Sequence, residues 1–221
     1  MKILLIAGHG NGDSGAVAHG YQEANLTREV VRLLKAELDN YAEVTVADTT
    51  KNWYEYLKTN SLNFKPYNYV LEIHFNAGGG TGTEIYVTTS EKSHGVETKI
   101  VEGISNIGFR NRGVKRKNFS VIDKVKKQGV SSALLEVCFI DNVDDMLRYQ
   151  TKKAEVIRAI ANGIAEGFGL EKKPDELTEA CRLLASKGII DSPDYWAKGK
   201  GYSDENTVLL IKKFARYVKG A

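Results

Sequence analysis

Short apolar runs alternate with segments of helical periodicity over about the first 170 residues of the chain. The run Ile3–Ala7 is wholly apolar and ends at a glycine-rich loop, which is typical of a buried strand. Between Leu26 and Leu38, leucine and valine recur at helical spacing and predict an amphipathic helix. Further strands are predicted at 44–47, 69–73, 84–88, 119–122 and 133–139, and further helices at 53–57, 96–107 and 157–168. This alternation predicts an α/β fold, an open and mostly parallel twisted sheet of about six strands flanked by helices.

The pattern changes at Leu170–Pro174, and no strand is predicted beyond it. Residues 175–187 predict a helix with acidic residues in its first turn and a glycine after its end. Ser192 and Ser203 are predicted to cap two further helices. We therefore expect a main domain over 1–172 and a small all-helical domain over 175–221, whose core is marginal at this size.

Composition excludes several classes of protein. The 221 residues are 42% hydrophobic and 27% charged, as in ordinary soluble domains, and the net charge of +3 is too small to indicate a nucleic-acid partner. The two cysteines, Cys138 and Cys181, form neither a disulfide framework nor a zinc pair. The apolar run 3–7 is shorter than the roughly 7–15 residues of a signal-peptide core, and nothing approaches the roughly 20 of a membrane span. We expect synthesis in the cytoplasm without a signal peptide, and no stable membrane insertion.

Three polar residues accompany the predicted strands. His9 follows the first strand, His74 ends the strand 69–73, and Glu136 lies inside the apolar run 133–140. Ligands of open parallel sheets bind at the carboxyl ends of the strands, so these side chains are expected to meet at one edge. Either histidine alone could be structural. A carboxylate in a core strand costs several kcal/mol unless it is paired, protonated or near a metal, so Glu136 indicates either a buried ion pair or a function, and we favour the function.

Two histidines and a carboxylate form a known catalytic zinc set, and a second carboxylate can then move protons. Glu136, Glu23 and Glu72 are the candidates for these two acidic roles. Glu23 opens the first helix directly after the loop of His9, although an acid there could also serve only the helix dipole. Glu72 shares a strand face with His74, where it either orients the imidazole or faces solvent.

Five ordered blocks of sequence resemble the motifs of the zinc-dependent N-acetylmuramoyl-L-alanine amidases of the amidase-3 family. The blocks are Gly8–Ala16, Glu23–Leu26, Glu72–Ala77, Asn111–Val114 and Leu135–Asn142. The resemblance covers about residues 1–170. Asn11 stands where many members have glycine, and Glu72 where many have serine.

The resemblance implies a site and a reaction. His9, Glu23 and His74 would bind one Zn²⁺, and Glu136 would be the catalytic carboxylate. The reaction would be hydrolysis of the amide between N-acetylmuramic acid and L-alanine in the peptidoglycan of a Gram-positive cell wall. Asn76 and Arg112 are candidate substrate-binding residues, although Asn76 could equally form an Asx turn before the glycines that follow it. A non-catalytic peptidoglycan-binding protein and a zinc peptidase that cuts within the stem peptide are the alternatives.

Two further features bear on partners. Eight basic residues and one acid lie between Phe109 and Gln128, a stretch that could grip anionic wall polymer or peptide carboxylates, or could be a solvated face. The segment 181–196 resembles small helical modules of wall hydrolases from Gram-positive bacteria and their phages. Its aromatic residues Tyr195 and Trp196, together with Tyr202, could stack on sugar rings or form the core of the unit.

The expected place of synthesis raises the question of how such an enzyme reaches the wall. A phage endolysin accumulates in the cytoplasm and reaches the wall after the membrane is permeabilised. The resemblance of the small C-terminal module to those of such enzymes favours this role. A mother-cell lytic enzyme of a spore former is the other option. The sequence leaves the oligomeric state open.

Overall fold

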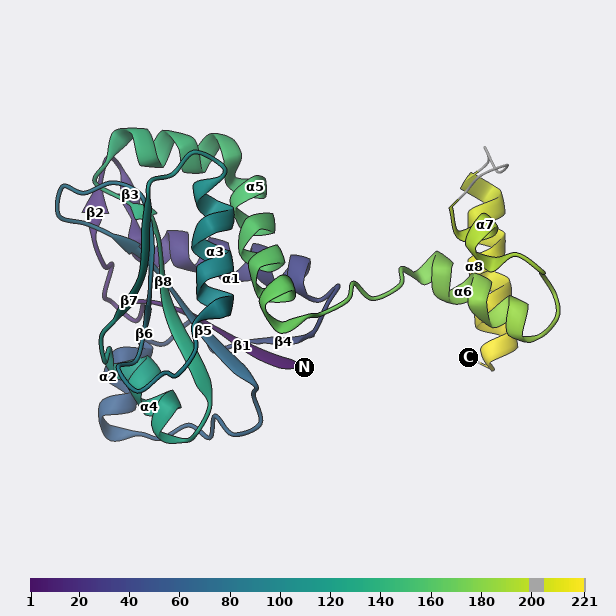
Figure 1. Ribbon diagram of the computed structural model, residues 1–221, viewed down its shortest axis with the longest axis horizontal. Helices are drawn as coiled ribbons and strands as arrows, with labels where there is room; N and C mark the ends of the chain where they lie inside the picture. Colours follow the sequence, from purple (N-terminus) through teal and green to yellow (C-terminus); the bar gives the residue numbers. More distant parts are fainter. Residues whose placement is uncertain (199–204, 221) are drawn as a thin grey trace. The chain divides into compact units, whose positions relative to one another are not determined.

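The computed structural model of the chain describes residues 1–198 and 205–220. These fall into two compact units, Met1–Glu171 and Lys172–Ala221, which are described separately (Figure 1).

The first unit is built on a six-stranded sheet with the strand order β4-β1-β5-β8-β6-β7. Strands β4, β1, β5 and β8 run parallel, β6 is antiparallel to β8, and β7 is parallel to β6, so the predicted mostly parallel sheet is confirmed. The strands are β1 (Lys2–Ala7), β4 (Glu43–Val46), β5 (Tyr69–Asn76), β6 (Thr83–Val87), β7 (Asn111–Arg116) and β8 (Ser131–Phe139). A separate two-stranded hairpin consists of β2 (Val17–Ala18) and β3 (Tyr21–Gln22).

Helices cover both faces of the sheet (Figure 1). On one face, α1 (Glu23–Leu38), α3 (Gly95–Ser105) and α5 (Val143–Phe168) enclose the larger apolar core. On the other face, two short helices, α2 (Trp53–Thr59) and α4 (Ser120–Lys127), enclose a smaller core around Leu4, Ile6 and Val70. Successive residues of a strand point to opposite faces, so Glu72 and His74 lie on the same face as Val70, beyond the cover of these two helices. The polar residues of β5 are therefore exposed to a pocket rather than to a core.

The structure differs from two of the predictions and contains an edge strand that was not predicted. Residues 119–122 do not form a strand, because Ser120 begins α4, where Val121, Ile122 and Val125 bury one side of the helix. A short apolar run does not by itself distinguish the two elements. The edge strand β7 was not predicted, since its sequence is basic and hardly apolar, as is common at sheet edges. His74 lies inside β5, two residues before the end of the strand.

In its described residues, the second unit contains the three predicted helices: α6 (Glu176–Ser186), α7 (Pro193–Ala197) and α8 (Glu205–Lys219). The Asp175 side chain caps α6 by accepting a hydrogen bond from the Thr178 N–H (2.7 Å). The buried apolar residues in the described part of the second unit are Ala180, Cys181, Leu184 and Ala215. The predicted cap Ser203 and the aromatic Tyr202 lie outside the described residues. Throughout residues 1–198 and 205–220, no helix has the length and apolar character that crossing a membrane requires.

Candidate active site

The loop after β1 presents His9 in a left-handed backbone conformation, with φ 61°. The Arg28 guanidinium of α1 holds this loop by donating to the carbonyl oxygens of Gly8 (2.9 Å) and His9 (2.8 Å). A Cβ atom on Gly10 would lie 1.9 Å from Nη2 of Arg28, so glycine at this position makes room for the guanidinium. The strained conformation of His9 is thus maintained by contacts with a neighbouring helix.

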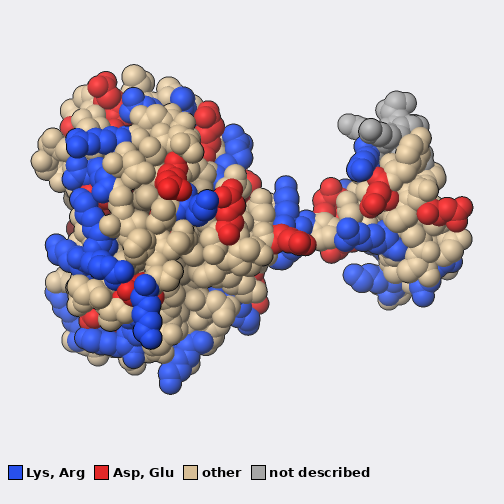
Figure 2. Space-filling view, in the orientation of Figure 1, with Lys and Arg blue, Asp and Glu red and all other residues tan. Residues whose placement is uncertain are grey.

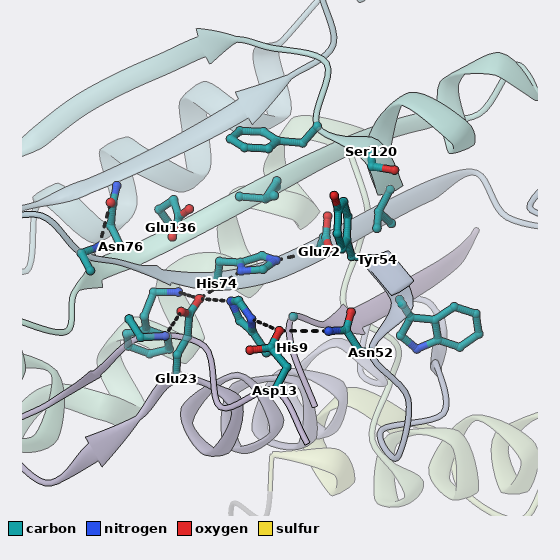
Figure 3. A pocket seen from close by; sticks show the side chains of 18 residues that line it. His9, Asp13, Glu23, Asn52, Tyr54, Glu72, His74, Asn76, Ser120 and Glu136 are labelled. Atoms are coloured by element: carbon teal, nitrogen blue, oxygen red, sulfur yellow. Dashed lines mark hydrogen bonds and ion pairs between the residues drawn. The ribbon is translucent and has the colours of Figure 1, made fainter. Parts of the chain in front are cut away.

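His9, Glu23 and His74 meet at one point, from three different elements (Figure 3). Oε1 of Glu23, the first residue of α1, lies 3.1 Å from Nε2 of His9 and 3.0 Å from Nδ1 of His74. One ligand atom from each of the three residues lies within 4.8 Å of the other two, so the group could hold a metal ion. Glu23 is only 3% exposed, which argues against a solvated acid that serves the helix dipole alone.

The second ring nitrogen of each imidazole is occupied by another carboxylate. Nδ1 of His9 lies 2.8 Å from Oδ2 of Asp13, and Nε2 of His74 lies 3.2 Å from Oε1 of Glu72. Asp13 also accepts a hydrogen bond from the side-chain amide of Asn52 (2.9 Å). Carboxylates in this position fix the ring orientation and make the ligand nitrogen more basic. Two imidazoles oriented in this way, together with one carboxylate, suit Zn²⁺.

Two glycines of the first motif lie against the ligands. A Cβ atom on Gly8 would lie 2.3 Å from Cε1 of His74, and one on Gly15 would lie 2.7 Å from Oε2 of Glu23. Real Cβ atoms essentially never approach so closely, so these positions require glycine for the side chains of His74 and Glu23 to keep their places.

Electrostatics couple His9, Glu23 and His74. Burial opposes the charged form of His74, but hydrogen bonds to Glu23 and Glu72 outweigh it and raise the pKa of the imidazole well above 6.5. Burial likewise acts to raise the pKa of Glu23, yet hydrogen bonds from His74 and His9 hold that pKa well below its usual range. Without a metal, the Glu23 carboxylate is a counter-ion shared by the two imidazoles. A metal cation would replace the protons that these groups share.

Glu136 lies beside His74 in the register of the parallel strands β5 and β8. Its Oε2 atom is buried and has no hydrogen-bond partner in the described part of the chain. Burial is the largest cause that raises the pKa of this carboxyl, to about 7. A carboxyl group with such a pKa can both accept and release a proton near neutrality.

Glu84 forms a second polar cluster next to Glu136. It faces Glu136 across the antiparallel pair β6–β8 and is only 1% exposed. Burial acts to raise its pKa, but hydrogen bonds from Lys115, Arg112 and Tyr86 outweigh it and lower the pKa to about 2.

The two predicted substrate-binding residues meet at this carboxylate. Arg112 of β7 donates to Glu84 through Nε, and Nδ2 of Asn76 donates to Oε1 of Glu84 (2.8 Å). Oδ1 of Asn76 accepts the Ala77 N–H (2.9 Å) at the start of the loop that follows β5, so its two amide atoms are both engaged. Asn76 lines the pocket at the ligand cluster, whereas Arg112 is not among the lining residues found in the described part of the chain.

The pocket extends from the ligand cluster to the starts of α2 and α4. Its lining includes aromatic as well as polar side chains: His9, Asp13, Glu23, Asn52, Trp53, Tyr54, Glu72, His74, Phe75, Asn76, Phe119, Ser120 and Glu136.

The basic stretch of residues 110–127 is largely engaged in contacts within the protein. Arg116 donates to the Glu91 carbonyl oxygen (2.6 Å), Lys126 pairs with the Glu91 carboxylate (2.7 Å), and Lys127 pairs with Asp123 (2.6 Å). Figure 2 shows lysine and arginine gathered along the side of the first unit where β7 and α4 lie.

Sequence reasoning did not identify Asp13, Arg28 or Glu84. Asp13 had a usable signal, since it follows His9 at a spacing of four in the same loop. Glu84 also had one, a carboxylate among Thr83, Ile85 and Val87. For Arg28, nothing in its own helix distinguishes it from a solvated cation.

Comparison with known proteins places the chain in a family. Residues 3–166 match the family Amidase_3, described as N-acetylmuramoyl-L-alanine amidase. The chain is 33% identical to N-acetylmuramoyl-L-alanine amidase CwlM of Bacillus licheniformis, over 91% of this chain and 83% of that protein. It is 31% identical to the endolysin of Bacillus phage SPP1, over 77% of this chain and 67% of that protein.

A solved structure has the same fold. The catalytic domain of CwlV, an N-acetylmuramoyl-L-alanine amidase from Bacillus (Paenibacillus) polymyxa var. colistinus, superposes with a TM-score of 0.62 at 24% identity. The match covers 77% of this chain and 100% of that domain. The family match covers well over half of the chain. The chain therefore belongs to the Amidase_3 family and is an N-acetylmuramoyl-L-alanine amidase, an enzyme whose substrate is peptidoglycan.

Proposed function

We propose that His9, Glu23 and His74 bind one zinc ion and that Glu136 is the catalytic carboxylate for hydrolysis of the amide between the lactyl group of N-acetylmuramic acid and L-alanine. One observation carries the proposal: three ligand atoms lie within 4.8 Å of one another, beside a buried carboxylate oxygen that has no partner among the described residues. Zinc, when bound, lowers the pKa of a water molecule and polarises a carbonyl group.

Glu136 handles the proton in this scheme. Its buried carboxyl group beside His74, with one oxygen that has no partner among the described residues, is placed to accept a proton from the attacking water and to deliver that proton to the amine of L-alanine as the C–N bond breaks. Asp13 and Glu72 keep the imidazoles oriented throughout. Nδ2 of Asn76 carries two hydrogens, of which Glu84 accepts one, so the other can be donated to substrate. Arg112 donates to Glu84 and so holds the carboxylate to which Asn76 also donates.

A digestion experiment tests the reaction. The zinc-loaded chain, incubated with purified peptidoglycan, is expected to release new N-terminal L-alanine without new reducing sugars. New amino groups on other residues would instead indicate a peptidase that cuts within the stem peptide. Binding without release of any group would indicate a non-catalytic peptidoglycan-binding protein.

Metal analysis tests the roles separately. The Glu136→Ala variant is expected to retain about one zinc per chain and to lose activity, whereas the matched His9→Ala variant is expected to lose the metal. Loss of zinc from Glu136→Ala, with the metal retained in His9→Ala, would show that Glu136 is a metal ligand and that His9 is not.

We also propose that the enzyme lyses cell walls as a phage endolysin does, after the membrane has been permeabilised. The similarity to an endolysin supports this role. Expression in a Gram-positive host should then cause lysis only when a membrane-permeabilising agent is added. Lysis without the agent, or none with it, would contradict the proposal.

The helical unit is proposed to anchor the enzyme to the wall. Tyr195 is 51% exposed and Tyr217 is 80% exposed, and aromatic rings of this kind can stack on sugars. A chain that ends at Lys173 should still cleave soluble muropeptides but bind walls more weakly. Unchanged wall binding would assign the unit to packing or dimerisation.

A further inference from the structure

The pocket has three positions along strand β5. Glu72, His74 and Asn76 alternate along the strand, point to the same face and all line the pocket. Neighbouring positions of this kind are about 6.7 Å apart. His74, with Glu136 beside it, occupies the middle position, with Glu72 on one side of it and Asn76 on the other.

The Glu72 end of the pocket is aromatic. Tyr54 is 50% exposed and lines the pocket together with Phe119 and Ser120. Figure 3 shows Tyr54 beside Glu72, on the opposite side of His74 from Asn76. A half-exposed aromatic ring in a pocket wall presents the kind of surface on which the C–H face of a pyranose ring stacks.

Glu72 also presents an unused hydrogen-bond acceptor at this end. Its side chain is 5% exposed, Oε1 holds His74, and Oε2 is buried with no hydrogen-bond partner in the described part of the chain. A buried oxygen without a partner costs about 1–3 kcal/mol, which a donor from a ligand would recover. Sugar hydroxyl and acetamido groups are neutral donors, whereas a peptide carboxylate would be repelled here.

The Asn76 end has the opposite charge. Asn76 donates to Glu84, and the single carboxylate of Glu84 is paired with two cations, Arg112 and Lys115. Glu84, Arg112 and Lys115 together therefore carry one excess positive charge, next to the pocket. This charge favours the carboxylates of a stem peptide and gives no advantage to a neutral sugar.

We infer that Tyr54, Glu72 and Ser120 form the subsite for the muramic acid ring, and that the stem peptide extends from the reacting amide past Asn76 towards Arg112 and Lys115. The inference rests on the proposed function, because it assumes cleavage at the junction of sugar and peptide. It assigns each half of the substrate to one end of the pocket.

The two products of the proposed reaction serve as separate probes of the two ends. N-acetylmuramic acid and an L-alanyl stem peptide are titrated into the zinc-loaded full chain, and each dissociation constant is measured by protein NMR. The Tyr54→Ala variant is expected to bind N-acetylmuramic acid about tenfold more weakly and the peptide within about twofold of wild type. Tyr54→Phe, which keeps the ring, is the matched control and should bind both probes as wild type does.

The reverse result would overturn the inference. If Tyr54→Ala weakens the peptide and not the sugar, the stem peptide occupies the aromatic end, and if it weakens neither, Tyr54 is not part of a subsite. The spectrum of the unliganded variant establishes that it is folded. Binding is measured without turnover, so these outcomes are independent of the digestion experiment, whose failure would contradict the proposed reaction itself.

Discussion

Replacing Glu84 by glutamine should destabilise the first unit in a way that depends on pH. The carboxylate is buried and bonded to Arg112, Lys115, Tyr86 and Asn76, which together lower its pKa from 4.5 to about 2 against the opposing effect of burial. At about 1.4 kcal/mol per pKa unit, this shift corresponds to about 3 kcal/mol of folding free energy at pH 7. That value is an upper bound, because Arg112 and Lys115 are partly exposed and can be hydrated again.

The sign of the pH dependence follows from the lowered pKa. The unfolded chain binds a proton at Glu84 before the folded chain does, so the stabilisation is complete above pH 4.5 and is lost as the pH falls towards about 2. Less than half of it should remain at pH 3. The Glu84→Gln variant cannot lose this contribution, so the difference in stability between wild type and variant should shrink over the same range.

Urea unfolding followed by fluorescence measures this difference. Trp53 and Trp196 are the two tryptophans of the chain, one in each unit, and a Trp196→Phe background leaves the signal of the first unit alone. The matched control is Glu43→Gln, which removes an exposed ion pair with Lys2 (3.3 Å) and should cost at most about 1 kcal/mol. Equal stabilities of Glu84→Gln and wild type at pH 7, or a loss that stays constant down to pH 3, would refute the reasoning.

Three further substitutions test the support of the ligand cluster. Asp13→Asn should weaken zinc binding about 10–100-fold in competition with a chromophoric chelator, because the imidazole of His9 loses its orienting carboxylate; unchanged affinity would contradict this. Gly8→Ala would place a Cβ atom 2.3 Å from the ring of His74 and displace it by about 1 Å, so kcat/KM should fall about 100-fold with an unchanged circular dichroism spectrum. Arg28→Lys keeps the positive charge but loses the guanidinium group that donates to the carbonyl oxygens of both Gly8 and His9. Zinc affinity should therefore fall while the melting temperature stays close to that of wild type. A lower melting temperature with unchanged zinc affinity would make Arg28 a purely structural residue.

Local sequence was sufficient for most elements of the first unit. The apolar runs 3–7, 69–73 and 133–139 predict strands because a buried strand needs no polar partner on either face. Residues 119–122 have a similar apolar character, but Val121 and Val125 pack in the core shared with α2 and the sheet, and this packing makes the segment a helix. A run of only four residues fits either periodicity, so tertiary packing decides.

Part of the site was also open to sequence reasoning. Polar residues at the ends or inside apolar strands indicated His9, His74 and Glu136, and the resemblance to a family supplied the roles expected of them and of Glu23. Glu84, like Glu136, is a carboxylate within a predicted strand. In a short strand of alternating polarity, however, such a residue also fits the solvent face, and only the pairing of β6 with β8 places it beside Glu136.

The sequence by itself determined most of the strands and helices of the first unit, the mostly parallel sheet and the chemical types of the side chains at its edge. These follow from local periodicity and from the cost of burying charge. Only the tertiary structure decided that Asp13 and Glu72 each hold an imidazole, and that Arg28 supports the loop of His9. Such contacts depend on strand register and on loop conformation, and these are set by the packing of the whole unit rather than by any one segment.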